Sequence, residues 1–168
     1  DWSSESASAT LNLAFNSIYM NNLADIGTGT VSYQGLLFSN GTNNVANNIV
    51  VSAETDFASY CIYRDLALGT LASDHNDFYP VNATNGNVGF FNTTATPTLL
   101  AWQTASSQDP NSLSVDPLFV SSTDLHLANT TTPLMGKGMA IPGVTTDFDG
   151  ETRDSIPEIG ADEFPGII

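Results

Sequence analysis

Short apolar runs separated by polar turn residues dominate the pattern of this chain. The runs are rich in β-branched and aromatic residues, and clusters of Gly, Asn, Thr and Asp lie between them. This pattern predicts β-strands within residues 11–20, 31–38, 48–52, 59–63, 77–81, 88–91 and 115–120. A helical pattern occurs once, over residues 98–105, where Thr98 is a suitable N-cap and Leu99 and Trp102 share a face. We therefore expect an all-β fold with one short α-helix near residues 98–105.

The apolar runs recur with a spacing close to 30 residues. A motif of Asn, one further residue and two large apolar residues begins at Asn16, Asn47 and Asn76, at spacings of 31 and 29 residues. Asp116 begins a similar motif 40 residues later, and this longer interval contains the predicted helix. Ser-Tyr pairs at 32–33 and 59–60 form a second series, 27 residues apart. Repeats of this length predict a solenoid of about four to five stacked coils.

The recurring asparagines have two interpretations. Asn tolerates the left-handed backbone conformation of tight turns, and its amide can hydrogen-bond to another amide stacked above it. Asn16, Asn47 and Asn76 would then form a structural ladder inside the solenoid. Alternatively, the same side chains line a sugar-binding groove.

Composition narrows the possible partners. The chain has 168 residues, a length that suits a single domain, and a formal charge of −15. This charge reflects a shortage of bases, because only Arg64, Lys137 and Arg153 are basic. Nucleic-acid binding requires a basic surface, so it is excluded, and anionic membranes are unfavourable for the same reason. No apolar run approaches the ~20 residues of a membrane helix, so we expect no membrane insertion.

The beginning of the chain and its single cysteine bear on location. The chain starts at Asp1 without a signal-peptide pattern, so we expect a mature or excised piece of a longer protein. Cys61 is alone, which leaves no internal disulfide, and its apolar surroundings predict a buried, inert thiol. Few lysines and many Asn, Ser and Thr residues are typical of an extracellular protein.

The C-terminal end is strongly acidic. Residues 147–164 contain seven of the eighteen acids, around the single base Arg153. Asp147, Asp149 and Glu151 are spaced two residues apart with Gly150 between, so their oxygens could converge on Ca²⁺. The pattern is not an EF-hand, because the glycine falls at the fourth position of the loop. We expect no cofactor, or Ca²⁺ alone at these three residues.

The alternative for the acidic end is a structural cap. In this interpretation Arg153 pairs with Asp147 or Asp149 and holds the tail against the last coil. A solenoid requires such a cap, because its last coil exposes unpaired backbone and core. The cap would include Asp162, and the apolar residues that close the open end would be Ile159, Ala161 and Phe164.

Ordered motifs over residues 73–164 resemble a known group of proteins. These motifs are SDHNDFYPVN, VGFFN, TLLAWQTASSQDPNSLSVDPLFVSSTDLHL, GVTTDFDGETR and IGADEF. They resemble the C-terminal portion of secreted bacterial cell-surface proteins with a right-handed parallel β-helix of the pectate-lyase-like fold, exported by the type IX route. The resemblance implies an extracellular location. Together with the repeat, which alone extends the fold to residues 1–72, it predicts a single β-helix domain over 1–168. Stacked coils with a helical excursion would occupy 1–113, and the last coil and acidic cap 114–168.

Candidate catalytic residues are few. The resemblance implies two kinds of catalytic site. Polysaccharide lyases of this fold pair Ca²⁺ with an Arg or Lys base, and its hydrolases carry three aspartates and a Gly-His-Gly element. Arg64 is flanked by Asp65, Lys137 lies in a turn, and His75 and His126 are separate in the sequence. A charge of −15 also repels the acidic polysaccharides that such lyases cleave. We therefore expect no catalysis by this chain itself.

The expected function is a non-enzymatic structural or adhesive module of a bacterial surface protein, in contact with glycans or with other proteins of a surface assembly. An adhesive surface would present Tyr19, Tyr33 and Tyr63 in an exposed row. Two alternatives remain open. The chain is the C-terminal part of a polysaccharide lyase or hydrolase whose catalytic coils lie upstream, or it is secreted cargo or a subunit of a secretion or surface assembly.

Overall fold

Parallel β-strands make up most of the fold in this computed structural model. The structure describes residues 9–21, 32–38, 40–65, 69–129 and 131–164. Within these ranges lie ten strands and one helix: β1 (Thr10–Ala14), β2 (Ser17–Met20), β3 (Ser32–Leu37), β4 (Thr42–Ala46), β5 (Ile49–Ser52), β6 (Ala58–Arg64), β7 (Thr70–Asp74), β8 (Asp77–Pro80), β9 (Gly86–Phe91), β10 (Thr94–Thr96) and α1 (Leu99–Ser106).

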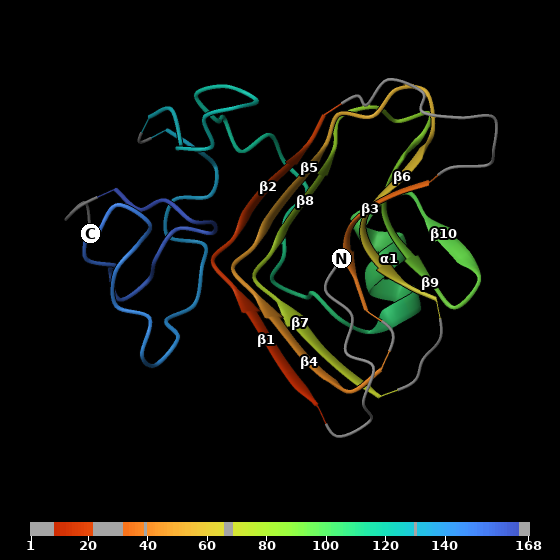
Figure 1. Cartoon of the computed structure of the whole chain (residues 1–168), viewed down its shortest axis with the longest axis horizontal. Helices are drawn as coiled ribbons and strands as arrows, with labels where there is room; N and C mark the ends of the chain where they lie inside the picture. The colour runs from red at the N-terminus through yellow and green to blue at the C-terminus, as the bar shows by residue number, and fades with distance from the viewer. Residues whose placement is uncertain (1–8, 22–31, 39, 66–68, 130, 165–168) are drawn as a thin grey trace.

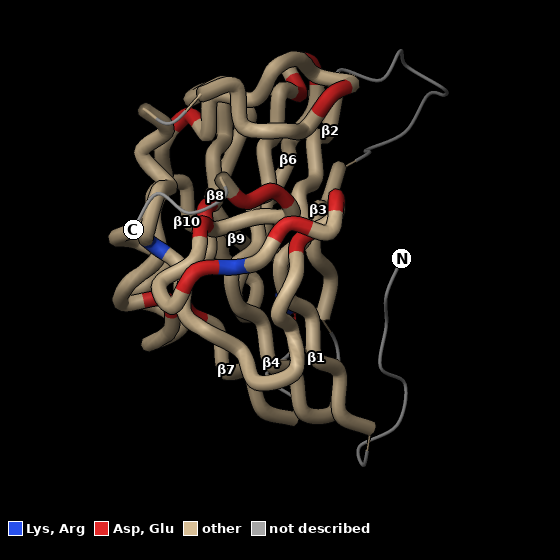
Figure 2. The backbone as a smooth tube through the Cα atoms, turned by 90° about the vertical axis from the view of Figure 1, so that its left-hand side faces the viewer, with Lys and Arg blue, Asp and Glu red and all other residues tan. Residues whose placement is uncertain are grey.

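The strands form three sheets, and each sheet takes one strand from each of three successive chain segments. The sheets have the orders β1-β4-β7, β2-β5-β8 and β3-β6-β9, and β10 extends the third sheet antiparallel to β9. All other neighbouring strands are parallel. In Figure 1 the three strands of each sheet lie behind one another, and Figure 2 shows β1, β4 and β7 running side by side. The expected all-β class with one short helix is therefore confirmed.

The corners between the first two strands of each segment explain the repeat. Phe15, Asn47 and His75 occupy equivalent corner positions, and each has a positive φ between 54° and 57°. The residue that follows each of them begins the turn into the next strand, so Asn16 aligns with Asn48 because Ser17 pairs with Ile49. The predicted alignment of Asn47 with Asn16 is therefore wrong by one residue. The register is ambiguous in the sequence because Asn47 and Asn48 are adjacent, and it is Asn47 that takes the left-handed corner position.

Two other features of the repeat also differ from expectation. Tyr33 pairs with Ser59, so the alignment of the two Ser-Tyr pairs is wrong by one residue. Leu113 pairs with Asp77, which places Ser112 opposite Asn76 and leaves Asp116 outside the repeat. The described residues therefore contain three complete segments, followed by this single bridge.

The sheet β1-β4-β7 was the least predictable. Its strands β4 and β7, with sequences TNNVA and TLASD, were not predicted, because polar side chains outnumber apolar ones in both. Alternate side chains nevertheless point inward in each strand, as a half-buried strand requires. The strand predicted at residues 115–120 is wrong: this stretch is irregular, with one isolated bridge between Phe119 and Leu127.

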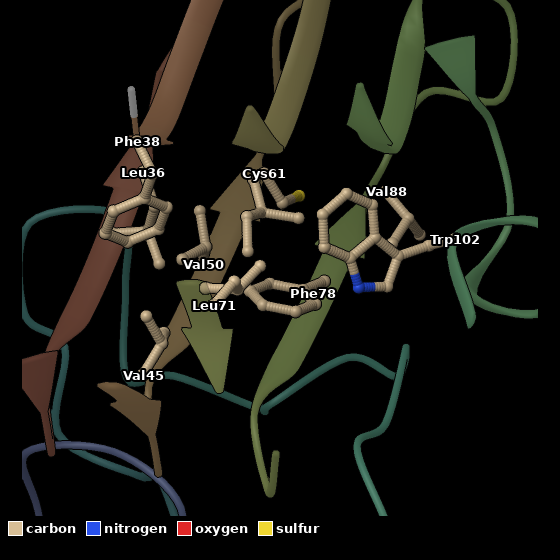
Figure 3. Close-up of a cluster of buried hydrophobic side chains, with 10 residues drawn as sticks. Leu36, Phe38, Val45, Val50, Cys61, Leu71, Phe78, Val88 and Trp102 are labelled. Carbon is tan, nitrogen blue, oxygen red and sulfur yellow. The ribbon is translucent and has the colours of Figure 1, made fainter. Parts of the chain in front are cut away.

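A row of buried apolar side chains runs along the stack between the sheets. Figure 3 shows this row from Phe38 and Leu36, past Val50 and Cys61, to Phe78, Val88 and Trp102. Burial raises the pKa of the Cys61 thiol well above its ordinary value, as expected for an inert cysteine.

Helix α1 supplies the last side chain of this row. Trp102 is fully buried, and its ring lies so close to Gly89 that a Cβ there would come within 2.4 Å of it. The hydroxyl of Thr98 accepts a hydrogen bond from the N–H of Ala101 at 3.2 Å, which confirms Thr98 as the N-cap. In the part of the chain that is described, no helix is long and apolar enough to cross a membrane.

The C-terminal segment, residues 113–164, covers the side of the stack and not its end. Every residue of β5 is buried, so its outward side chains also need a cover. Ile49 and Val51 pack against Leu127, Leu134 and Ile159, which form a second apolar cluster. Figure 1 shows this segment beside β2 and β5. The prediction that it closes the open end of the last coil is therefore wrong.

The other residues assigned to the cap lie on this same lateral surface. Phe164 is half-buried against the second apolar cluster, and the N–H of Ala161 donates to Ser17 Oγ at 3.0 Å. Ser17 belongs to the first segment and Ile49 to the second, so the C-terminal segment spans neighbouring segments of the stack. It contributes to stability by covering the outward face of β2-β5-β8.

Asp77 provides a pH test of the packing between β8 and this segment. Its carboxyl is fully buried, Oδ1 accepts the N–H of Val115 at 3.0 Å, and Oδ2 has no hydrogen-bond partner in the described structure. Burial, and to a lesser degree the charge of Asp116, raise the pKa of Asp77 to about 8. The unfolded value is about 3.9.

Between these two pKa values the folded chain holds a proton that the unfolded chain releases. The free energy of unfolding should therefore fall as the pH rises from about 4 to 8, by up to about 1.4 kcal/mol for each pH unit. Asp77→Asn keeps an acceptor for Val115 and should remove this part of the pH dependence. Urea unfolding at several pH values tests it, with the exposed Asp65→Asn as control; equal pH slopes in wild type and Asp77→Asn would contradict the prediction.

Candidate functional site

A column of carboxamides joins the three segments at their first corner. Asn16 Nδ2 donates to Asn48 Oδ1 at 2.8 Å, and Asn48 Nδ2 donates to Asn76 Oδ1 at 3.0 Å. The column ends on Asp109, whose Oδ1 accepts from Asn76 Nδ2 at 3.0 Å. We call these residues the Asn column. Asn48 and Asn76 are fully buried, so they do not line a sugar-binding groove.

The Asn column also satisfies the backbone at the corners. Asn48 Oδ1 accepts the N–H of Asn16 at 3.2 Å, and Asn76 Oδ1 accepts the N–H of Asn48 at 3.0 Å. Asn48 Nδ2 in turn donates to the carbonyl of Ala46 at 3.0 Å. Each carboxamide thus bonds within its own corner and to the next segment, as buried polar groups require.

Asp109 replaces a fourth asparagine at the end of the column. Its carboxylate accepts hydrogen bonds from Ser73 Oγ at 2.9 Å and from Ser112 Oγ at 2.7 Å, in addition to that from Asn76. Its second oxygen accepts from Trp102 Nε1 at 2.7 Å. Asp109 therefore connects the column to α1, a role that the sequence pattern did not reveal.

Asn47 has a different role from the one predicted for it. Its Nδ2 donates to the carbonyl of Met139 at 2.7 Å, and its Oδ1 accepts the N–H of Met139 at 2.9 Å. Its own carbonyl accepts the N–H of Gly160 at 2.9 Å. Asn47 thus attaches the C-terminal segment to the corner of the second segment.

Arg153 makes the second attachment, but with a different partner from the predicted one. Its guanidinium pairs with Glu163 at 3.1 Å, and Nη2 donates to the carbonyls of Gly160 at 3.2 Å and Ala161 at 3.0 Å. The guanidinium carbon lies 3.8 Å from the centre of the Phe15 ring, a cation–π contact. The predicted pairing with Asp147 or Asp149 is wrong.

Asp147 is engaged by the backbone instead. Its Oδ1 accepts the N–H groups of Asp149 at 2.9 Å and Glu151 at 2.8 Å, and its Oδ2 accepts the N–H of Glu163 at 3.1 Å. This aspartate therefore shapes the acidic turn and joins it to the end of the segment.

The predicted calcium ligands do not form the group of metal-ligating side chains found in the described residues. That group consists of His126, Asp149 and Asp162, with one ligand atom from each and all three atoms within 4.8 Å of one another. Of the three predicted ligands, Asp149 alone belongs to it. Calcium binding by Asp147, Asp149 and Glu151 stays a prediction.

His126 lies between two carboxylates. Its Nε2 is 2.9 Å from Asp149 Oδ2, and its Nδ1 contacts Asp124 Oδ1. Hydrogen bonds to Asp124 and then Asp149 raise the pKa of His126 to about 9, so the ring is an imidazolium at neutral pH. Asp162 is nearly buried, and its Oδ2 accepts the N–H of Leu127 at 2.8 Å.

The three tyrosines expected in one exposed row have separate environments. Tyr19 packs in the second apolar cluster, and Tyr33 contacts Phe57 edge to face with its hydroxyl buried. Tyr63 instead stacks on Phe90, with ring centres 4.5 Å apart and planes 3° apart.

Tyr60 completes a group with Tyr63 and Phe90. Its ring meets each of the other two edge to face, with centres 5.4 Å apart. We call these three residues the aromatic patch; they lie on neighbouring strands β6 and β9, and all three are half-buried. Phe90 was missed because the prediction followed tyrosines alone, and Tyr60 was not among the tyrosines assigned to the row.

The Asn column predicts a large effect of one substitution. Asn48→Ala leaves the part-buried N–H of Asn16 without its acceptor and removes the hydrogen bonds that the Asn48 carboxamide makes to Asn16, Asn76 and the carbonyls of Leu13 and Ala46. It should therefore lower the free energy of unfolding by roughly 2–4 kcal/mol. Chemical denaturation measures this change. Asn44→Ala is the matched control, because Asn44 bonds to Asn12 across the same two segments at 2.7 Å but is exposed. Its cost should stay within about 0.5 kcal/mol, and equal costs would contradict the assignment.

A second prediction concerns the attachment of the C-terminal segment. Arg153→Lys keeps the charge but loses the planar fork, so residues 147–164 should exchange their amide hydrogens faster while β5 and β8 remain protected. Hydrogen-exchange mass spectrometry measures both regions. Lys137→Arg is the control, because Lys137 is exposed. Unchanged exchange of residues 147–164 in Arg153→Lys would refute a stabilising role of the guanidinium.

Comparison with known proteins adds no identity to this geometry. No known protein family matches the chain, and no curated protein or solved structure shows significant similarity to it. The resemblance of residues 73–164 to secreted β-helix proteins of the type IX class therefore stays a prediction.

Proposed function

We propose that the chain is a non-enzymatic, extracellular β-helix module of a bacterial surface protein that holds neutral glycans. In this proposal the three segments are coils of a right-handed parallel β-helix. Support comes from the parallel pairing of successive segments within each of the three sheets, and from the Asn column. A stack of this kind offers a regular, rigid surface for contacts.

The distribution of charge favours a neutral partner. Two of the three basic side chains are engaged inside the protein: Arg64 is 6% exposed and bonds to the carbonyl of Gly69, and Arg153 pairs with Glu163. Acidic positions clearly outnumber basic ones on the side shown in Figure 2. A surface of this charge repels uronate-rich polysaccharides and leaves uncharged sugars as the compatible class.

The aromatic patch is the observation that carries the glycan contact. Tyr60, Tyr63 and Phe90 are partly exposed on the neighbouring strands β6 and β9. Aromatic rings pack well against the C–H faces of sugars. The tyrosine hydroxyls add polar groups at the edge of the apolar rings. Gln34 and Asn87 pair in register with Tyr60 on the two neighbouring strands, which adds amide groups beside the patch.

Tyr63→Ala tests this proposal. Binding to a panel of neutral gluco-, manno- and galacto-oligosaccharides should fall at least about tenfold, because the variant loses a central aromatic contact. Circular dichroism verifies that the variant remains folded. Phe148→Ala is the control, because Phe148 is 81% exposed but lies on the C-terminal segment. Absence of neutral-glycan binding by the wild type, or an equal loss in Phe148→Ala, would overturn the proposal.

A further inference from the structure

We propose that His126, Asp149 and Asp162 form a binding site for a divalent transition-metal ion of the zinc class. The three side chains come from separate loops of the C-terminal segment, and the fold brings them together. Asp149 is 23 residues and Asp162 is 36 residues after His126. This site is independent of the aromatic patch and of the proposed glycan contact.

The spacing of the ligand atoms suits one small ion. His126 Nε2 and Asp149 Oδ2 are 2.9 Å apart, and the ligand atoms of all three residues lie within 4.8 Å of one another. Ligands at about 2.0–2.2 Å from a tetrahedral zinc ion are roughly 3.4 Å apart. Small side-chain rotations therefore suffice to place the ion between the three residues. The ion takes the place of the proton between His126 and Asp149, and that proton goes to solvent.

The burial of Asp162 makes a positive charge beside it necessary. Asp162 is 9% exposed, and its Oδ2 is held by the N–H of Leu127. In the absence of an ion this charge comes from the His126 imidazolium, which lies beside Asp162. Arg153, the nearby base of the segment, is already engaged by Glu163. A divalent ion between the three side chains would replace that positive charge when His126 releases its proton.

Neighbouring residues orient the His126 ring and leave the site open to solvent. Asp124 contacts Nδ1 of His126, which directs Nε2 toward Asp149 and Asp162, as an outer carboxylate does for a metal-bound histidine. An open pocket of ≈ 510 Å³ lined by His126, Asp162 and Phe148, among others, gives the ion and its water ligands a path from solvent. Three protein ligands would leave at least one coordination position for water.

The donor set selects the class of metal. One imidazole nitrogen and two carboxylate oxygens suit Zn²⁺ and related first-row ions. Ca²⁺ prefers six to eight oxygen ligands, more than His126, Asp149 and Asp162 offer. The proposal is therefore distinct from calcium binding at Asp147, Asp149 and Glu151.

Titration of the full chain with ZnCl₂ by isothermal titration calorimetry tests the site. We expect one Zn²⁺ per chain, and His126→Ala and Asp162→Asn should each weaken binding at least about tenfold. Asp162→Asn retains an acceptor for Leu127, so its fold should persist if His126→Ala destabilises the loops. His75→Ala is the matched control, because His75 also lies beside an aspartate, at 3.3 Å from Asp74.

Co²⁺ used as a spectroscopic probe should show the absorption of a four- or five-coordinate site in the wild type and lose it in both variants. Wild-type protein that binds no Zn²⁺, or binding that His126→Ala and Asp162→Asn leave unchanged, would overturn the proposal. So would loss of binding in His75→Ala, or displacement of Zn²⁺ by an equal concentration of Ca²⁺.

Discussion

The hydrogen bond between buried carboxamides of successive segments is the interaction on which the rest of the structure depends. It can form only when the corner of each segment lies directly above the next, so it sets the register of all three sheets at once. The same carboxamides satisfy backbone groups that the corner leaves unpaired, which makes a shift in register costly. Asp109 extends this constraint to α1 through Trp102, and the apolar row between the sheets is closed at that end.

The second constraint is the apolar outer face of β5. A strand with apolar side chains on both faces requires a cover on its outer face. The C-terminal segment covers that face of β5 with Ile159 and Leu134. Asn47 fixes that segment to one corner by hydrogen bonds to its backbone, and Arg153 contacts the Phe15 ring at another corner from within the segment. This attachment gives an irregular stretch of chain a defined position. It thereby brings His126, Asp149 and Asp162 together, although they are distant in sequence.

The sequence predicted the strands whose side chains are mostly apolar, the helix and its Thr98 cap, because hydrophobic pattern and capping are local signals. It did not predict β4 and β7, because polar residues outnumber apolar ones there and pairing with neighbours determines their conformation. The predicted alignment was wrong at Asn47 because both Asn47 and Asn48 are suitable residues for the corner. The continuous apolar run Ile49-Val50-Val51 is typical of a strand buried on both faces, but we predicted only a strand there and no lateral cover. The partners of Arg153 and His126 depend on tertiary contacts that no local pattern encodes.

Amide hydrogen exchange of the asparagine side chains, measured by NMR, tests most directly the claim that the Asn column joins the segments. The carboxamide protons of Asn48 and Asn76 should be strongly protected, because they are buried and bonded on both sides. Those of Asn44 should exchange at the rate of an exposed amide. If the carboxamide of Asn48 exchanges as fast as that of Asn44 under native conditions, the column does not hold the stack together.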